Sequence, residues 1–289
     1  MDGDSSSQLK SKFEENGYAI IKGFLTEDEC DDLHRECHQI VEKMNPEEHS
    51  TVFSCDRQTN NDYFMNSADK VRFFFEKEAL DEKGNLKVDK QMSLNKIGHA
   101  LHVFSPGFRR ITHCERVRNI CRSLGLQDPV VCQSMVIFKP PHIGGEVNPH
   151  QDSSYLFTEP KRLVGIWIAL EDTTRENSCL WFIPGSHKDG LAGNYRMIIN
   201  PKKDPEVGTV FTGEKPSFDQ SKFISGEVNK GDLVLIHGEV VHRSDANRSD
   251  KSRLIYTFHI YDEGVAKYSS QNWLQPTEAN TFTHVYTFQ

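Results

Sequence analysis

Apolar residues near the start of the chain recur first with helical spacing and then as a continuous run. Leu9 and Phe13 lie four residues apart and Gly17 follows them, which predicts a helix that ends at this glycine. Residues 18–21 form a short apolar run of strand-forming types. The pattern therefore predicts a helix followed at once by a strand.

A second helix is expected to begin beside Thr26, because Thr26 and Glu29 have the spacing of a capping box. Beyond it, apolar residues recur every three or four positions and predict one buried face: Cys30, Leu33, Cys37, Ile40, Val41 and Met44. Cysteine and methionine on such a face usually fill a core. We therefore interpret this helix as scaffold.

The next stretch of the chain has weaker patterns. Residues 45–65 are polar and without period, which predicts a surface loop. Residues 71–75 have the composition of a strand, and Lys-Gly-Asn at 83–85 is typical of a turn.

Beyond residue 128 the chain changes to short runs of strand-forming residues separated by Gly, Pro, Asn and Asp. The expected strands cover residues 130–138, 163–170, 180–183, 233–237 and 254–260. Helices first and strands later predict a mainly β, α+β fold, a β-sandwich or jelly roll with flanking N-terminal helices.

One domain over residues 1–289 is expected, because no repeat and no flexible linker divides the chain. We divide it into a helical flank over about 1–128, a β core over about 129–262 and a C-terminal extension over 263–289. With 36% hydrophobic and 26% charged residues, the chain can bury a substantial core.

Charge and composition exclude several classes of partner. The net charge of −8 argues against a nucleic-acid surface, and no apolar stretch is long enough to cross a membrane. Seven scattered cysteines without a C-x-x-C pair indicate reduced thiols. The chain carries neither an apolar N-terminal signal nor a Ser-Lys-Leu terminus. We expect a cytoplasmic monomer that acts on a small molecule.

Three residues form a candidate metal site. His150 and Asp152 are two positions apart where a loop leads into a strand, so their side chains point to the same side of an extended chain. His242 follows the predicted strand at 233–237 and supplies a third ligand. Two histidines and one carboxylate form the facial triad of non-haem Fe(II), which leaves three coordination positions free. The His-x-Asp triplet alone is a weak signal.

Arg253 strengthens this interpretation. It opens the strand at 254–260, whose alternation places Arg253, Ile255 and Thr257 on one face. A guanidinium is poor core material, but it is a good partner for a carboxylate. His237 competes with His242 for the third ligand position, because alternation from Leu233 could also point it inward.

With these residues in place, the chain resembles the phytanoyl-CoA dioxygenase family through nearly its whole length. The runs that carry the resemblance are residues 16–18, 71–77, 95–102, 133–135, 138–142, 144–152, 181–187, 231–238 and 272–276. Runs of this length are far more specific than the triplet.

The resemblance implies a double-stranded β-helix that binds Fe(II), 2-oxoglutarate and O₂, with ascorbate as a candidate reductant. His150, Asp152 and His242 match the family's iron ligands, which favours His242 over His237. Positions that match contacts to 2-oxoglutarate are Arg253, Ser244, Lys96, Met135 and Trp167. The implied reaction decarboxylates 2-oxoglutarate to succinate and CO₂ and hydroxylates a small or lipid-derived substrate, for which an acyl-CoA is one candidate.

Other interpretations of the same residues remain open. Without the resemblance, Lys96 is an exposed lysine, and Met135 and Trp167 are core residues. Ser178 departs from the family, which usually has glycine in a turn there. Four histidines keep an undecided structural or substrate-facing role: His99, His102, His142 and His187. The alternative functions are a hydroxylase or demethylase of proteins on the same fold, and a catalytically silent cupin-like metal-binding module.

Overall fold

The computed structural model describes residues 3–48, 62–202 and 207–288. Among these residues, the α-helices belong to the first half of the chain. They are α1 (Gly3–Asn16), α2 (Glu27–Glu42), α3 (Asp62–Met65), α4 (Leu101–Phe104), α5 (Pro106–Thr112) and α6 (Glu115–Ser123). Among all the described residues, no helix is long and apolar enough to cross a membrane.

The ends of the first two helices form as the sequence predicts. Gly17 has a φ of +79° and its N–H donates to the carbonyl of Phe13, so α1 ends there. Thr26 and Glu29 form both hydrogen bonds of a capping box at the start of α2. The predicted face of α2 is buried except Ile40, which is partly buried against the same core.

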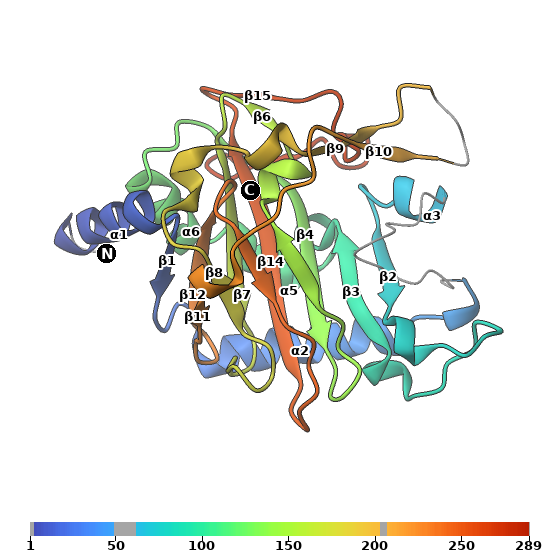
Figure 1. The fold of residues 1–289 in the computed structure, drawn as a ribbon. Helices are drawn as coiled ribbons and strands as arrows, with labels where there is room; N and C mark the ends of the chain where they lie inside the picture. Colours follow the sequence, from blue (N-terminus) through green and yellow to red (C-terminus); the bar gives the residue numbers. More distant parts are fainter. Residues whose placement is uncertain (1–2, 49–61, 203–206, 289) are drawn as a thin grey trace.

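An eight-stranded, antiparallel major sheet forms the centre of the molecule (Figure 1). Its strands, in spatial order, are β1 (Tyr18–Ile21), β12 (Leu233–His237), β7 (Leu163–Ala169), β14 (Arg253–Asp262), β4 (Pro129–Lys139), β3 (Leu94–His99) and β2 (Val71–Phe75), with β16 (Thr283–His284) beside β4.

A four-stranded minor sheet has the order β11 (Ile224–Gly226), β8 (Leu180–Phe182), β13 (His242–Ser244) and β5 (Val147–His150). Two further pairs are β10 (Thr209–Thr212) with β9 (Arg196–Ile199), and β15 (Lys267–Tyr268) with β6 (Thr158–Glu159). Two antiparallel sheets with N-terminal helices confirm the predicted jelly-roll fold.

Each face of the major sheet has its own apolar core. On one face, Leu33 of α2 and Phe108 of α5 belong to the same buried cluster as Tyr256 and Phe258 of β14. Figure 1 shows α2 passing behind the strands of this sheet. On the other face, Ile255 of β14 packs in a cluster with residues of the minor sheet, among them Leu180 and Phe182. The side chains between the two sheets are therefore enclosed.

Three expectations from the sequence need comment. Residues 49–61 of the predicted loop lie outside the described residues, and the loop prediction is wrong for Asp62–Met65, which forms α3. The predicted strands at 18–21, 71–75 and 233–237 have the predicted bounds, and the others differ by one or two residues at one or both ends. Strand β3 was not predicted, because its apolar positions are interrupted by Asn95, Lys96 and His99.

Candidate metal centre

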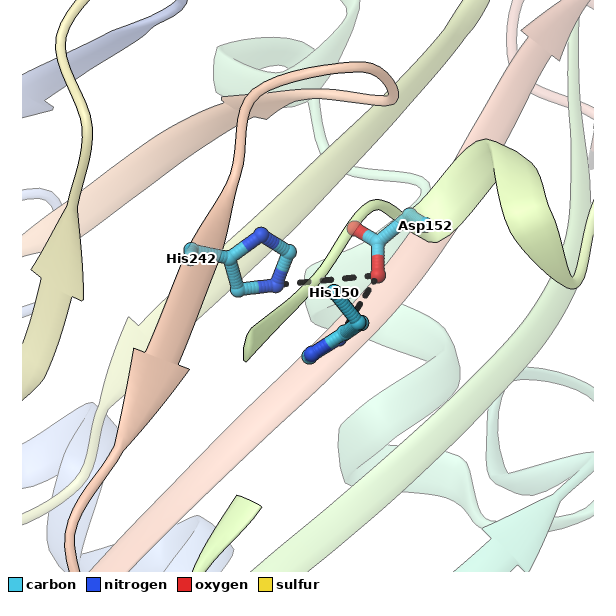
Figure 2. Close-up of side chains that lie close together, drawn as sticks. All are labelled: His150, Asp152 and His242. Carbon is cyan, nitrogen blue, oxygen red and sulfur yellow. Dashed lines mark ion pairs between the residues drawn. The ribbon is translucent and has the colours of Figure 1, made fainter. Parts of the chain in front are cut away.

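The three predicted metal ligands come from two neighbouring strands of the minor sheet and the turn after one of them. His150 ends β5, Asp152 opens the 3₁₀ turn Asp152–Ser154, and His242 begins β13. His150 and His242 are partners across the β5–β13 ladder, so the antiparallel register brings the two imidazoles together. Figure 2 shows both rings turned toward the carboxylate of Asp152.

One carboxylate oxygen faces both imidazoles. Oδ1 of Asp152 lies 3.5 Å from Nε2 of His150 and 3.7 Å from Nε2 of His242. All three candidate ligand atoms lie within 4.8 Å of one another. Two imidazole nitrogens and one carboxylate oxygen that converge in this way form the donor set of a non-haem Fe(II) site.

Hydrogen bonds fix which nitrogen of each ring is free to bind a metal. Nδ1 of His150 lies 2.8 Å from the carbonyl oxygen of Asn148, and Nδ1 of His242 lies 3.1 Å from that of Val240. A carbonyl only accepts, so Nδ1 carries a hydrogen, and in the neutral ring Nε2 then keeps its lone pair. Burial and the nearby His150 lower the pKa of His242 to about 4, which leaves its ring neutral at pH 7. These residues fit a divalent cation.

The carboxylate of Asp152 is ionised. Burial by itself raises its pKa, but the surrounding imidazoles of His242, His259 and His150 outweigh burial and hold the pKa well below its usual range. Its second oxygen, Oδ2, lies 3.2 Å from Nε2 of His259 on β14. The sequence reasoning missed His259. His259 lies six residues after Arg253, so the alternation along this strand places it on the same face and could have identified it.

A cavity of about 180 Å³ opens beside these residues. Four of the predicted site residues line it: Lys96, Met135, His150 and Asp152. Lys96 is buried on β3, with its ammonium 5.3 Å from the ring centroid of Phe74, so the interpretation of Lys96 as an exposed lysine is wrong. The rest of the wall combines apolar and aromatic residues, among them Phe64, Ile137, Tyr155, Leu156 and Trp273, with the polar residues Asn95, His99, Gln133, Asn148 and His259.

Arg253 begins β14 and lies on the same face of this strand as His259, but it does not line this cavity. It is 2% exposed, one terminal nitrogen donates to the carbonyl of Ser178 at 2.8 Å, and the guanidinium carbon lies 5.7 Å from the Trp167 ring centroid. Among the described residues, Nε of Arg253 has no hydrogen-bond partner and no carboxylate forms an ion pair with it. A buried guanidinium without an ion pair can bind an anionic ligand.

Trp167 and Ser244 are buried near the other site residues but outside the cavity lining. Trp167 and Met135 flank Thr257 on neighbouring strands, so all three side chains share the inner face of the major sheet. Ser244 lies two positions after His242 on β13. Ser178 has a φ of +75°, which agrees with the turn that the resemblance implied there.

His237 and the four histidines that the sequence left undecided lie apart from the three ligands. The ring of His237 packs against Phe13 and His187, with centroids 5.7 and 4.8 Å away, on the helix side of the major sheet. His99 lines the cavity and bonds to Ser67. His102 is buried against Ser134, and the exposed His142 pairs with Asp250.

Comparison with known proteins agrees with this geometry. The family model described as "Phytanoyl-CoA dioxygenase (PhyH)" matches residues 13–255. A Danio rerio protein named phytanoyl-CoA dioxygenase domain-containing protein 1 is 51% identical, over 98% of this chain and 99% of its own. A phytanoyl-CoA dioxygenase of Arabidopsis thaliana is 42% identical over 91% of each chain.

Among solved structures, the non-haem α-ketoglutarate-dependent epimerase SnoN from nogalamycin biosynthesis superposes with a TM-score of 0.66 at 16% identity, over 98% of this chain and 99% of its own. At that identity the likeness shows a shared fold. The sequence identity to the relatives and the family match carry the assignment. The chain belongs to the phytanoyl-CoA dioxygenase family and is an Fe(II)- and 2-oxoglutarate-dependent dioxygenase.

Proposed function

We propose that His150, Asp152 and His242 hold the Fe(II) and that the enzyme hydroxylates a small or lipid-derived substrate. The observation that carries this proposal is the convergence of the Nε2 atoms of His150 and His242 on Oδ1 of Asp152, while each Nδ1 faces a backbone carbonyl. Three protein ligands on one side leave three positions free. When bound there, the iron supplies the oxidative decarboxylation of 2-oxoglutarate and the oxidation of a substrate C–H bond.

Arg253 is the proposed partner of the distal carboxylate of 2-oxoglutarate. Its buried guanidinium forms no ion pair among the described residues, and burial, opposed by the charges of Glu171 and Glu76, lowers its pKa to about 10, so it stays charged at pH 7. A planar guanidinium can hold a carboxylate through two parallel hydrogen bonds. Further proposed contacts to the co-substrate are Ser244, Lys96, Met135 and Trp167.

We propose that the substrate enters the cavity beside His150 and Asp152. At about 180 Å³ the cavity is below the roughly 300–1,000 Å³ of pockets that enclose drug-sized ligands, which suits one small molecule or one segment of a longer one. Its aromatic wall favours an apolar segment over the charged surface of a protein. Among its described lining residues, Lys96 is the one cation. An acyl-CoA would therefore place its acyl chain here and its phosphates outside.

Asp152 also bears on the outcome of the reaction. Halogenases of the wider class lack an acidic residue at this position, so the carboxylate favours hydroxylation over halogenation.

We further propose that residues 1–289 act as one cytoplasmic oxygenase domain, without nucleic acid or membrane as partner.

The first experiment measures consumption of 2-oxoglutarate and formation of succinate by the purified protein with Fe(II) and ascorbate, while candidate substrates are screened. A substrate raises turnover above the uncoupled rate and gains one oxygen atom in the mass spectrum. Stimulation by a protein or peptide instead would favour the protein hydroxylase.

The second experiment tests Arg253. Arg253→Ala should leave Mn(II) affinity nearly intact but weaken 2-oxoglutarate binding by about 2–5 kcal/mol, roughly 30-fold to several thousandfold. Arg253→Lys should recover little, because an ammonium cannot reproduce the planar geometry. The measurement is calorimetric titration of 2-oxoglutarate into the Mn(II)-loaded protein. Unchanged affinity in Arg253→Ala removes this contact from the proposal, and no binding by the wild type favours the silent metal-binding module.

A further inference from the structure

His259 touches the oxygen of Asp152 that the two proposed imidazole ligands leave free. Oδ1 of Asp152 faces His150 and His242, whereas Oδ2 lies 3.2 Å from Nε2 of His259. The His259 side chain is buried, and it comes from β14, whereas the proposed ligands come from the minor sheet and its turn. The two oxygens of one carboxylate therefore have separate partners on the two sheets.

A second hydrogen bond fixes the hydrogen on His259. The side-chain amide nitrogen of Gln133 lies 3.1 Å from Nδ1 of His259, and an amide nitrogen only donates. Nδ1 is therefore the acceptor, and Nε2 carries the hydrogen that faces Oδ2 of Asp152. Gln133 is itself buried, on β4 beside β14. Gln133 therefore donates to His259, and His259 in turn donates to Asp152.

The backbone opposite leaves room for this pair. Gly165 of β7 is the cross-strand partner of His259. A Cβ at Gly165 would lie 3.3 Å from Oδ2 of Asp152 and 3.5 Å from Nε2 of His259. A Cβ there would crowd Oδ2 of Asp152 and would touch Nε2 of His259 at an ordinary van der Waals distance. The absence of one lets the carboxylate approach the sheet closely enough to meet His259.

We propose that His259 is a positioning residue that keeps Oδ2 of Asp152 away from the iron, so that Asp152 binds through Oδ1 alone. This inference rests on the proposed ligand role of Asp152. A carboxylate that binds through both oxygens would occupy one of the three positions that the facial triad leaves free. Since 2-oxoglutarate and O₂ need those positions, a fixed Oδ2 preserves the site for co-substrate binding.

The test measures Mn(II) affinity of the metal-free protein by calorimetry, and then 2-oxoglutarate affinity of the Mn(II)-loaded protein. His259→Leu removes the donor and should weaken Mn(II) binding by about 10- to 100-fold, as loss of a hydrogen-bond partner of a metal ligand does. It should also weaken 2-oxoglutarate binding, because Oδ2 is free to compete. His259→Gln, whose amide nitrogen can replace Nε2 as donor, should restore most of both affinities.

His99→Leu is the matched control, because His99 is also a buried histidine of the cavity wall but bonds to Ser67. It should bind Mn(II) as the wild type does, whereas equal weakening in both variants would overturn the positioning role. Unchanged Mn(II) affinity in folded His259→Leu would also overturn it. If His259→Leu does not fold, Gln133→Leu decides, since it frees the ring to turn: weaker Mn(II) binding supports the proposal and unchanged binding overturns it.

His150→Ala separates this inference from the proposed function. Loss of Mn(II) binding in His150→Ala together with wild-type binding in His259→Leu would overturn only the role of His259. Wild-type Mn(II) binding in His150→Ala would overturn the ligand assignment itself.

Discussion

Strand β14 is buried along its whole length, yet its two faces differ in chemistry. The helix side carries Leu254, Tyr256, Phe258 and Ile260, all in the large apolar core. The cavity side carries Arg253, Ile255, Thr257 and His259, three of them polar or charged. Burial alone therefore does not identify a functional face. Polar residues repeated every second position on a buried strand do, because each one costs stability unless it has a partner.

The polar groups on the two faces also differ in how they are satisfied. On the helix side, the hydroxyl of Tyr256 bonds to Thr112 at 2.6 Å and Ser134 bonds to Nδ1 of His102 at 2.8 Å. On the cavity side, Nε of Arg253 and the hydroxyl of Ser178 are buried without a partner among the described residues. Nε2 of His102 on the helix side is also buried without a partner among the described residues, so what sets the cavity side apart is that its partnerless nitrogen belongs to a charged group, the Arg253 guanidinium.

Two histidines on opposite sides of the major sheet give the largest expected difference. His242→Ala should abolish Mn(II) binding and 2-oxoglutarate turnover. His237→Ala should keep both and lose only stability, because its ring packs on Phe13 and His187. Titration with Mn(II) distinguishes them, and the reverse ranking would place the third ligand on His237.

Phe258→Ala tests the helix side. Truncation of this fully buried ring should lower the free energy of unfolding by about 3–5 kcal/mol, through lost burial and the cavity left behind. Mn(II) affinity of the folded fraction should stay as in the wild type. Urea denaturation gives the first quantity and calorimetry the second. If metal affinity fell as steeply as stability, the two faces would not be independent.

His102 makes the helix side sensitive to acid. Burial lowers its pKa to about 3, below its ordinary 6.5. At a pH between these two pKa values, His102 is protonated in the unfolded chain but neutral in the folded protein. The stability of the folded protein is therefore unaffected by His102 above pH 6.5 and falls as the pH falls below it, by up to about 1.4 kcal/mol per pH unit. His102→Asn, which can keep the bond to Ser134, should show a shallower loss of stability between pH 6 and pH 4, measured by urea denaturation. An unchanged slope would contradict this assignment.

Ser178 gives the smallest expected effect, on the cavity side. Its φ of +75° is strained for a residue with a side chain, and its hydroxyl is buried without a partner among the described residues. Ser178→Gly should stabilise the metal-free protein by about 1 kcal/mol, since relief of strain exceeds the entropy that glycine adds to the unfolded chain. Thermal unfolding checks this. A less stable variant would mean that the hydroxyl has a favourable contact.

Much of the fold could be predicted because its signals are local. The capping box at Thr26, the stop at Gly17 and the alternation along β12 and β14 depend on residues close together in the chain. Strand β3 and helix α3 could not be predicted. Their residues follow neither period clearly, and in β3 contacts with the neighbouring strands override the weak local preference.

The sequence by itself determined the family, the pairing of His150 with Asp152 and the alternating polar face of β14, but the strand expected at this pair was wrong, because β5 ends at His150 and Asp152 lies in the turn that follows. It could not determine that Oδ2 of Asp152 meets His259, or that His237 faces the helices while His242 faces the carboxylate. Those facts depend on the register of β13 with β5 and on which face of the major sheet each side chain takes. Only tertiary structure fixes them, because a shift of one residue in register would turn every side chain of a strand to the opposite face.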